Sequence, residues 1–369
     1  MSIYEQVVSF IHSPELAGFG ALAMSVFHYQ FQNVQAYRQF CVEQGCGPAS
    51  VRSINEIPAV STFAFKYANL VDAAATNSAQ ALVFLTSGTT AGRNRRGRHV
   101  VIHPEIYRAS AIGHLRAMLF PDGRRLRILA IHPTAEVMPE SSLSRMISWC
   151  IEEFGNSTTL CAADRRGVDL THATEFLRDS KSAADPVCIL GTTAALSAIF
   201  EHLDRKHETI SLPPGSRVMD TGGPKGQEVP LDPAEVVANS HRLLSIDPDW
   251  VINEYGMTEL CSQLYDATRF NSAGIGPRRS KIAPPWLRVA AVDPVTLKPV
   301  RDGALGILRF FDLANVGSVS AILTEDVGAV RGNRIEIIGR AALGEPRGCA
   351  LAIEQFAANA LSQEQERHV

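Results

Sequence analysis

The sequence lacks the features that would place the protein in a membrane, outside the cell or on a nucleic acid. Its 369 residues contain no apolar run approaching the roughly 20 residues of a membrane helix, and the N-terminus does not resemble a signal peptide. Neither sign of charge predominates, with 35 basic and 38 acidic residues, so no global field would attract DNA or an anionic bilayer. We therefore expect a cytoplasmic protein with no nucleic-acid or membrane partner.

Paired cysteines and familiar catalytic motifs are also missing. The seven cysteines are odd in number and scattered, which suits a reducing compartment better than a disulfide framework. Cys41 and Cys46 have no second Cys/His pair at ligand spacing, so structural zinc is not expected. The loop of nucleoside triphosphatases that ends in Gly-Lys-Ser/Thr is absent. None of the 11 histidines lies in a motif that predicts more than an ordinary surface or core role.

Apolar periodicity indicates an α/β fold followed by a β-rich part. Short strands are expected at 81–85, 126–131, 187–190, near Val218 and at 250–253, and the first two should be buried. Helices should alternate with them, at 143–154, 194–203 and 234–244. Ser141 or Ser142 would cap the first of these helices. From residue 284 strand follows strand, at 287–292, 306–311, 321–324 and 334–338.

These patterns suggest three parts. We expect an α/β core over residues 1–283, a β-rich subdomain over 284–340, and a short tail over 341–369 with one helix-like stretch at 351–361.

A run of small and hydroxyl residues follows the expected strand at 81–85. Its members are Thr86, Ser87, Gly88, Thr89, Thr90, Ala91 and Gly92. Such residues let backbone N–H groups and hydroxyls crowd around phosphate oxygens, so the run predicts a polyphosphate-binding loop that leads into a strand at 98–103. Arg93, Arg95, Arg96 and Arg98 would supply positive charge to the phosphates, although a solvated basic hairpin tip would have the same composition.

A second motif, Asn253-Glu-Tyr-Gly-Met-Thr-Glu259, follows the expected strand at 250–253. Open α/β sheets bind their ligands at the carboxyl ends of strands, so we expect both motifs to lie beside one crevice. Further segments complete the pattern: Phe27-His-Tyr-Gln30 with Tyr37, Gly222-Gly-Pro-Lys-Gly226, Thr324-Glu-Asp-Val-Gly328 and Arg347-Gly-Cys349.

In these motifs the sequence resembles the adenylate-forming superfamily of acyl-CoA synthetases, nonribosomal adenylation domains and luciferases. The resemblance covers most of the chain. Within this superfamily the sequence looks most similar to the LuxE-type acyl-protein synthetases of bacterial luminescence. It also resembles shortened relatives in phenazine-antibiotic pathways. The implied fold is the large N-terminal domain of an adenylating enzyme.

The resemblance implies a nucleotide site for ATP. Adenine would stack on Tyr255, next to Gly256, in a pocket lined by the backbone of Gly222 and Gly223. The ribose hydroxyls would bind Asp326, with Arg340 close by. Taken singly, Tyr255 could be an ordinary buried tyrosine and residues 324–328 a surface turn.

The resemblance also implies the reaction. A substrate carboxylate would attack the α-phosphorus of ATP, with Thr258 on the α-phosphate and Mg²⁺ on Glu259. With Arg93 and its neighbours, these groups would neutralise developing charge. Two departures weaken the expectation of full activity. The superfamily's lysine-bearing lid domain is expected to be absent, since the last lysine is Lys298, and Ala91 with Arg93 replaces a common glycine and downstream lysine.

The acyl acceptor is left open. Cys349 matches the cysteine that takes the acyl group as a thioester in the luminescence enzymes, yet it could equally be a buried core residue. We expect an ATP-dependent ligase that acts on a small carboxylic acid and delivers the acyl group to its own cysteine or to a partner protein such as a reductase. A coenzyme A ligase and a non-catalytic nucleotide-binding scaffold are the alternatives.

The acid and the oligomeric state are also left open. The substrate is either a fatty acid or a flat aromatic acid of the phenazine type, and the acid pocket is expected within residues 131–142. A second copy of the chain, in a homodimer, is a possible partner.

Overall fold

The computed structural model describes residues 1–72, 80–86, 96–222, 232–270 and 279–340, and it divides the chain into two compact units. Unit 1 comprises Met1–Ser110, Thr258–Ser262 and Ile282–Val369. Unit 2 comprises Ala111–Met257 and Gln263–Lys281. None of the helices in the described part of the chain has both the length and the apolar character needed to cross a bilayer.

Unit 2 is built on a mostly parallel sheet. Its strands, in spatial order, are β5 (Leu160–Cys161), β4 (Arg127–Ala130), β8 (Val187–Thr192), β9 (Arg217–Thr221), β10 (Val251–Tyr255) and β11 (Leu264–Asp266). β11 is antiparallel to β10, whereas the other neighbours pair in parallel. A small hairpin joins β6 (Ala163–Asp164) to β7 (Gly167–Val168).

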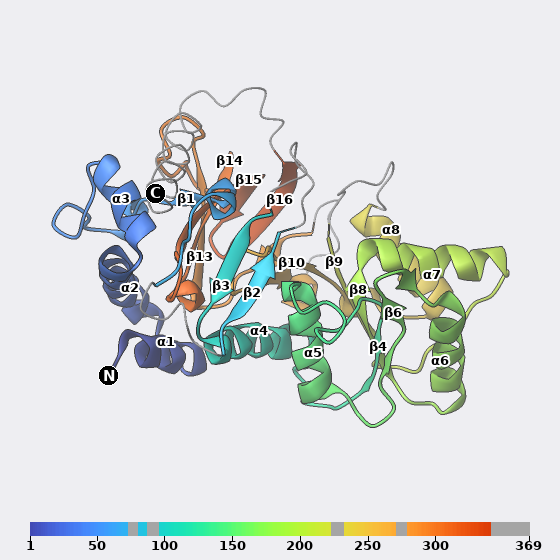
Figure 1. The fold of residues 1–369 in the computed structure, drawn as a ribbon. Helices are drawn as coiled ribbons and strands as arrows, with labels where there is room; N and C mark the ends of the chain where they lie inside the picture. The colour runs from blue at the N-terminus through green and yellow to red at the C-terminus, as the bar shows by residue number, and fades with distance from the viewer. Residues whose placement is uncertain (73–79, 87–95, 223–231, 271–278, 341–369) are drawn as a thin grey trace. The chain divides into compact units, whose positions relative to one another are not determined.

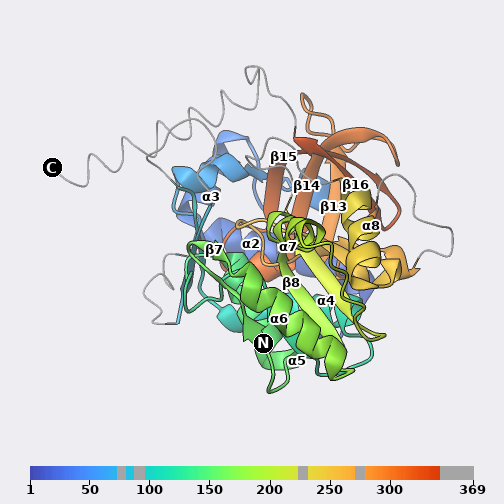
Figure 2. The same cartoon turned by 90° about the vertical axis from the view of Figure 1, so that its right-hand side faces the viewer.

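Helices connect the parallel strands. They are α5 (Ser142–Phe154), α6 (Leu170–Ser182), α7 (Thr193–Arg205) and α8 (Pro233–Leu244), with the short turns η5 (Pro248–Trp250) and η6 (Thr268–Phe270). α4 (Pro104–Leu119) begins in unit 1 and ends in unit 2. Figures 1 and 2 show α6 and α7 over the same face of the sheet. There Phe176, Leu196 and Val236 share a core with Ile189 and Val218. All residues of β8 up to Gly191 are buried, as expected for a parallel strand.

Unit 1 contains an antiparallel sheet and the N-terminal helices. The sheet order is β13 (Leu287–Val292), β14 (Leu305–Asp312), β15 (Ala321–Arg331) and β16 (Arg334–Arg340), and β1 (Val60–Ser61) pairs in parallel with β15. Strands β2 (Leu82–Leu85) and β3 (Arg98–Val101) form a separate hairpin. The chain returns from unit 2 through β12 (Lys281–Ile282).

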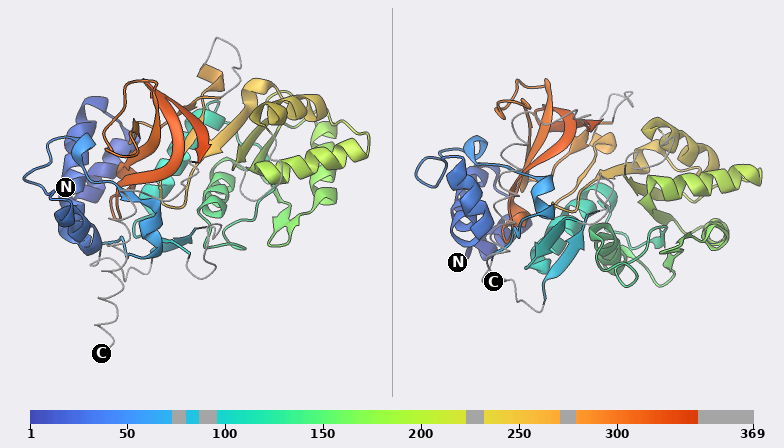
Figure 3. Two further views of the ribbon diagram at one scale, coloured as in Figure 1. Left: turned by 90° about the horizontal axis from the view of Figure 1, so that it is seen from above. Right: turned by 45° about the horizontal axis from the view of Figure 1, so that its top comes forward.

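The helical elements of unit 1 are α1 (Ile3–His12), η1 (Leu16–Gly18), α2 (Phe19–Asn33), α3 (Gln35–Glu43), η2 (Ile54–Glu56), η3 (Thr62–Lys66) and η7 (Leu313–Asn315). Both views of Figure 3 show the N-terminal helices, in blue, beside the twisted orange and red sheet.

Buried polar contacts fasten the N-terminal segments to this sheet. The Arg309 guanidinium on β14 donates to the carbonyl oxygens of Ile54, Asn55 and Ile57 at 2.7–2.8 Å. The Gln30 amide on α2 donates to the Asn315 carbonyl at 3.0 Å and to the Val316 carbonyl at 3.2 Å. Because groups buried this deeply must be paired, these bonds fix where the helices lie.

Most of the expected elements are confirmed, and with them the α/β class with a β-rich part. Ser141 caps α5 by accepting from the Ser144 N–H. The expected buried strand at 81–85 is wrong in one respect: in β2 only Phe84 is buried and Val83 is 36% exposed, because the strand belongs to a two-stranded hairpin. Residues 324–328 are not a surface turn but lie inside β15. The helix-like stretch at 351–361 lies outside the described residues.

Candidate active site

The carboxyl ends of β9 and β10 hold the unit 2 part of the predicted site. The two strands are paired in parallel, with Thr221 opposite Glu254, so the residues that follow them emerge from neighbouring strands. Gly222 follows β9 with φ +111°, a conformation that side-chain-bearing residues rarely adopt. Tyr255 ends β10 and is partly exposed, which does not fit an ordinary buried tyrosine.

A buried carboxylate explains the glycine at position 256. The Thr221 hydroxyl donates to Glu254, whose side chain is 5% exposed. A Cβ added at Gly256 would lie 2.3 Å from Glu254 Oε1, closer than any side chain tolerates. A side chain at position 256 would therefore have to displace the Glu254 carboxylate from its bond with Thr221.

Further polar contacts fix the carboxyl ends of β9 and β10. Asp220 accepts from the Thr193 hydroxyl at 2.6 Å and from the Asn253 amide at 3.0 Å, and burial raises the pKa of its carboxyl. Lys281 Nζ donates to Asn253 Oδ1 at 2.7 Å and to Asp266 Oδ1 at 3.1 Å. The backbone that presents Gly222 and Tyr255 thus rests on a hydrogen-bonded network, in which Asp220 Oδ1 is buried without a partner among the described residues.

Unit 1 contains the flanks of the predicted phosphate loop. The Thr86 hydroxyl accepts from the Gly97 N–H at 2.9 Å, and its carbonyl accepts from Arg96 Nε at 2.7 Å. Arg96 therefore ties together the two ends of the loop that joins β2 to β3. Residues 87–95, which include Ser87, Gly88, Thr89, Thr90 and Arg93, lie outside the described residues.

Unit 1 also holds Thr258 and Glu259, in an irregular segment rather than a strand. The Thr258 carbonyl lies 2.7 Å from His99 Nδ1, and the Glu259 carbonyl accepts from Asn315 Nδ2 at 2.7 Å. The Glu259 side chain is 8% exposed. His99 and Asn315 were not predicted from the sequence, where neither belongs to a recognisable motif.

Asp326 and Arg340 are brought together as the predicted ribose site requires. They lie opposite each other on β15 and β16, with Arg340 Nε 3.5 Å from Asp326 Oδ1. The Asp326 N–H donates to the Thr324 hydroxyl at 3.0 Å, which fixes the backbone beside the carboxylate.

The predicted residues thus fall into two groups, one in each unit. Gly222, Tyr255 and Gly256 belong to unit 2, whereas unit 1 holds the other predicted residues that the structure describes, Thr86, Thr258, Glu259, Asp326 and Arg340. Their convergence on one nucleotide stays a prediction, as do the roles of Gly223 and Cys349, which lie outside the described residues. Among the side chains that are described, no three His, Cys, Asp or Glu residues gather into a metal-binding set.

Comparison with known proteins assigns the chain. The family model described as "Acyl-protein synthetase, LuxE" matches residues 16–357. The chain belongs to this acyl-protein synthetase family. Proteins named long-chain-fatty-acid–luciferin-component ligase, from Aliivibrio fischeri and Vibrio harveyi, are each 22% identical to it, over 347 and 352 residues. Both alignments cover 90% of this chain and 86% of the relative.

The fold agrees with this assignment. A structure of 2-hydroxyisobutyryl-CoA ligase in an open conformation, in complex with 2-HIB-AMP and CoA, matches with a TM-score of 0.66 and 16% identity, over 87% of this chain and 73% of that one. A second structure of that ligase, in the postadenylation state, matches with a TM-score of 0.65 and 14% identity over 87% of this chain and 67% of that one. This acyl-protein synthetase is therefore an adenylate-forming ligase.

Proposed function

We propose that this acyl-protein synthetase uses ATP to convert a carboxylic acid to its acyl-adenylate and then passes the acyl group to a thiol. What supports the proposal most is that the family match runs over residues 16–357, which include both motifs and Asp326. In this reaction the substrate carboxylate attacks the α-phosphorus, the bond to the bridging oxygen breaks, and pyrophosphate leaves. Proton transfer is not required in this first step, so binding and orientation supply most of its catalysis. In the second step the thiol loses its proton to solvent, the thiolate attacks the acyl carbon, the acyl–phosphate bond breaks, and AMP leaves.

The described residues suit the nucleotide part of this substrate. The partly exposed ring of Tyr255 offers a face for adenine, and Gly222 leaves its backbone uncovered beside it. On Asp326 a carboxylate has lone pairs for two ribose hydroxyls in addition to Arg340, which would orient it. The hydroxyl run that starts at Thr86 would hold the β- and γ-phosphates with Arg93.

A magnesium ion fits the donor set. Mg²⁺ commonly binds through one or two carboxylates and the oxygens of a phosphate substrate, so Glu259 is sufficient as the protein ligand. The described residues contain no cluster of three His, Cys, Asp or Glu side chains, and a magnesium ion bound mainly by phosphate oxygens does not need one. When bound, the ion would neutralise charge on the phosphate oxygens. The chain's own contribution at the α-phosphate would come from Thr258.

We propose a long-chain fatty acid as the substrate, because both curated relatives carry that substrate class in their names. The segment expected to contact the acid includes His132, whose pKa burial lowers to about 4. At neutral pH its ring is uncharged, and Nε2 lies 3.2 Å from the Ser144 hydroxyl. An uncharged His132 ring suits contact with the apolar part of an acid. Activation of a flat aromatic acid of the phenazine type, in place of a fatty acid, would change this assignment.

Pyrophosphate exchange tests the first half-reaction. Long-chain fatty, benzoic and fused-ring aromatic acids are offered separately with ATP and labelled pyrophosphate. We expect exchange with fatty acids and little with the others. Absence of exchange with every acid, together with calorimetric binding of ATP, would instead identify a nucleotide-binding scaffold.

The thiol acceptor needs a separate test, with Cys349 as the proposed residue. After incubation with ATP and the acid, intact mass should show one hydroxylamine-sensitive acyl group, and Cys349→Ser should abolish it while exchange persists. Cys161→Ser is the matched control, since Cys161 is an exposed thiol. Unchanged product formation by Cys349→Ser with free coenzyme A would favour a coenzyme A ligase.

A further inference from the structure

The five residues Thr258–Ser262 form an irregular stretch of unit 1 that we call the 258–262 segment. It contains Thr258 and Glu259, to which the proposed function assigns the α-phosphate and the magnesium ion. The segment has no strand partner of its own. Its backbone therefore depends on side chains for hydrogen-bond partners, and several of these lie in the described part of the chain.

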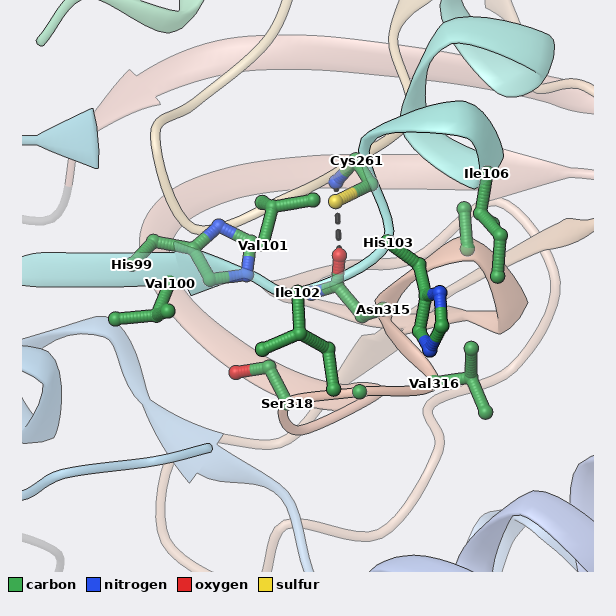
Figure 4. Close-up of a pocket in the computed structure, with 12 residues that line it drawn as sticks. His99, Val100, Val101, Ile102, His103, Ile106, Cys261, Asn315, Val316 and Ser318 are labelled. Carbon is green, nitrogen blue, oxygen red and sulfur yellow. Dashed lines mark hydrogen bonds between the residues drawn. The ribbon is translucent and has the colours of Figure 1, made fainter. Parts of the chain in front are cut away.

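One set of contacts comes from η7 and the residue before it. Asn315 Nδ2 donates to the Glu259 carbonyl at 2.7 Å, and Asn315 Oδ1 accepts from the Cys261 N–H at 2.8 Å. Asp312 accepts from the same N–H at 3.0 Å and from the Ser262 hydroxyl at 2.7 Å. Both side chains are at most 2% exposed. Figure 4 shows the bond between Cys261 and Asn315.

A further contact comes from the β2–β3 hairpin, in addition to the Ser110 hydroxyl, which lies 2.9 Å from the Ser262 hydroxyl. His99 lies on β3 opposite Phe84, is 1% exposed, and has Nδ1 2.7 Å from the Thr258 carbonyl. It stands two residues after Gly97, whose N–H donates to the Thr86 hydroxyl. The hairpin that carries the predicted phosphate loop is thus bonded directly to the residue predicted to contact the α-phosphate.

The protonation state of His99 follows from its surroundings. A carbonyl oxygen can only accept, so Nδ1 must carry the proton and donate. Burial lowers the pKa of the ring to about 4, so His99 is neutral at physiological pH and Nε2 is deprotonated. Nε2 is buried without a hydrogen-bond partner in the described part of the chain.

An unpaired buried acceptor destabilises the fold, and a leucine would fill the same space without this cost. The ring already lies among apolar groups, with Phe65 edge-on at 5.6 Å. What histidine adds at this place is the Nδ1–H donor. Its benefit must therefore lie in the Thr258 carbonyl that it holds.

We propose that His99 is a positioning residue for the adenylation reaction, because its Nδ1–H fixes the Thr258 carbonyl relative to the phosphate-loop hairpin while Asn315 holds the next carbonyl, that of Glu259. The inference rests on the proposed function and identifies which residues maintain its α-phosphate site. His99 contacts neither the nucleotide nor the acid in this scheme. It acts through the backbone of Thr258.

The test compares His99→Leu, which removes the donor, with His99→Asn, whose side-chain N–H can replace Nδ1–H. In pyrophosphate exchange we expect His99→Leu to lose about tenfold in kcat, the effect of one hydrogen bond worth about 1.4 kcal/mol. The KM for ATP should change less than about threefold, because the adenine and ribose contacts remain. His99→Asn should recover most of the loss.

His114→Leu is the matched control. His114 is 5% exposed, has a pKa of about 4, and places Nδ1 2.9 Å from the Gln263 carbonyl, so it has the same chemistry at a carbonyl with no assigned role. We expect exchange close to wild type for this variant. Equal losses in the two leucine variants, an unchanged kcat in His99→Leu, or no recovery in His99→Asn would each overturn the proposal.

Two further measurements keep folding and function apart. A ¹H–¹⁵N long-range spectrum of the wild type should show His99 as the Nδ1–H tautomer, and hydrogen exchange of a peptide spanning residues 256–264 should rise in His99→Leu at unchanged melting temperature. If none of the acids supports pyrophosphate exchange by the wild type, the proposed function fails, and with it the catalytic part of the inference. An Nε2–H tautomer in an active enzyme would refute the inference alone.

Discussion

Lowering the pH from 7 to 5 is expected to destabilise unit 2 by several kcal/mol and unit 1 much less. In unit 2, burial lowers the pKa of His114 and His132 from 6.5 to about 4. The unfolded chain takes up these protons as the pH falls below 6.5, whereas the folded chain does so only near 4, so stability is lost in between. At pH 5 each histidine contributes a loss of about 2 kcal/mol, at roughly 1.4 kcal/mol per pH unit.

In unit 1 the loss of stability at low pH is largely offset by a carboxyl group whose pKa is raised. His99 contributes the same loss of about 2 kcal/mol at pH 5, since its pKa is also about 4. Burial raises the pKa of Asp312 from 3.8 to about 6, so the folded state gains a proton first and is stabilised by about 1.4 kcal/mol at pH 5. The net loss in unit 1 is about 0.6 kcal/mol. In unit 2 the two histidines together contribute about 4 kcal/mol; the raised pKa of Asp220 opposes this loss, and the pKa of His202, lowered by desolvation, adds to it.

Hydrogen exchange at pH 7 and pH 5, corrected for the intrinsic exchange rate, measures the two units separately. Core peptides around β8 and β9 should lose protection at pH 5, whereas those from β14 and β15 should change little. His114→Asn should remove about 2 kcal/mol of the pH dependence in unit 2. His172→Asn, at a side chain 65% exposed, is the control and should leave it unchanged. Equal losses of protection in both units would refute the reasoning.

Three substitutions test individual contacts. Gly222→Ala forces alanine to φ +111° and should cost unit 2 about 1–3 kcal/mol in urea unfolding. Gly256→Ala should reduce pyrophosphate exchange about tenfold or more, because the new Cβ meets Glu254 Oε1, and the added change Glu254→Ala should restore part of it. Arg309→Met leaves three carbonyl oxygens without their donor and should destabilise unit 1 by about 3 kcal/mol or more in the same assay, whereas the exposed Arg301→Met should not.

The helices and strands could largely be predicted because their signals are local. The apolar spacing from Leu143 to Phe154 and the preceding serine were sufficient to place α5 and its cap. Strand β13 begins and ends at the predicted residues, 287 and 292. Where the prediction was wrong, at 81–85, an apolar run could not reveal whether it would enter a large sheet or a two-stranded hairpin.

The division into units could not be predicted, since it depends on contacts between residues far apart in sequence. The 258–262 segment lies between two stretches of unit 2 and still belongs to unit 1. Its partners Asp312 and Asn315 follow about fifty residues later, in a stretch with no apolar period. No composition shift marks such an arrangement.

The three histidines at positions 99, 114 and 132 show what sequence patterns leave undecided. Each is buried or largely buried, each has a pKa near 4, and each would be assigned an ordinary core role from its neighbours in the chain. They differ in the group that each one contacts: the Thr258 carbonyl, the Gln263 carbonyl and the Ser144 hydroxyl. A histidine next to an unremarkable carbonyl can be replaced at the cost of one hydrogen bond. The same bond to Thr258 should also affect the rate of adenylation, because the backbone it holds would carry a group that contacts the reacting phosphate.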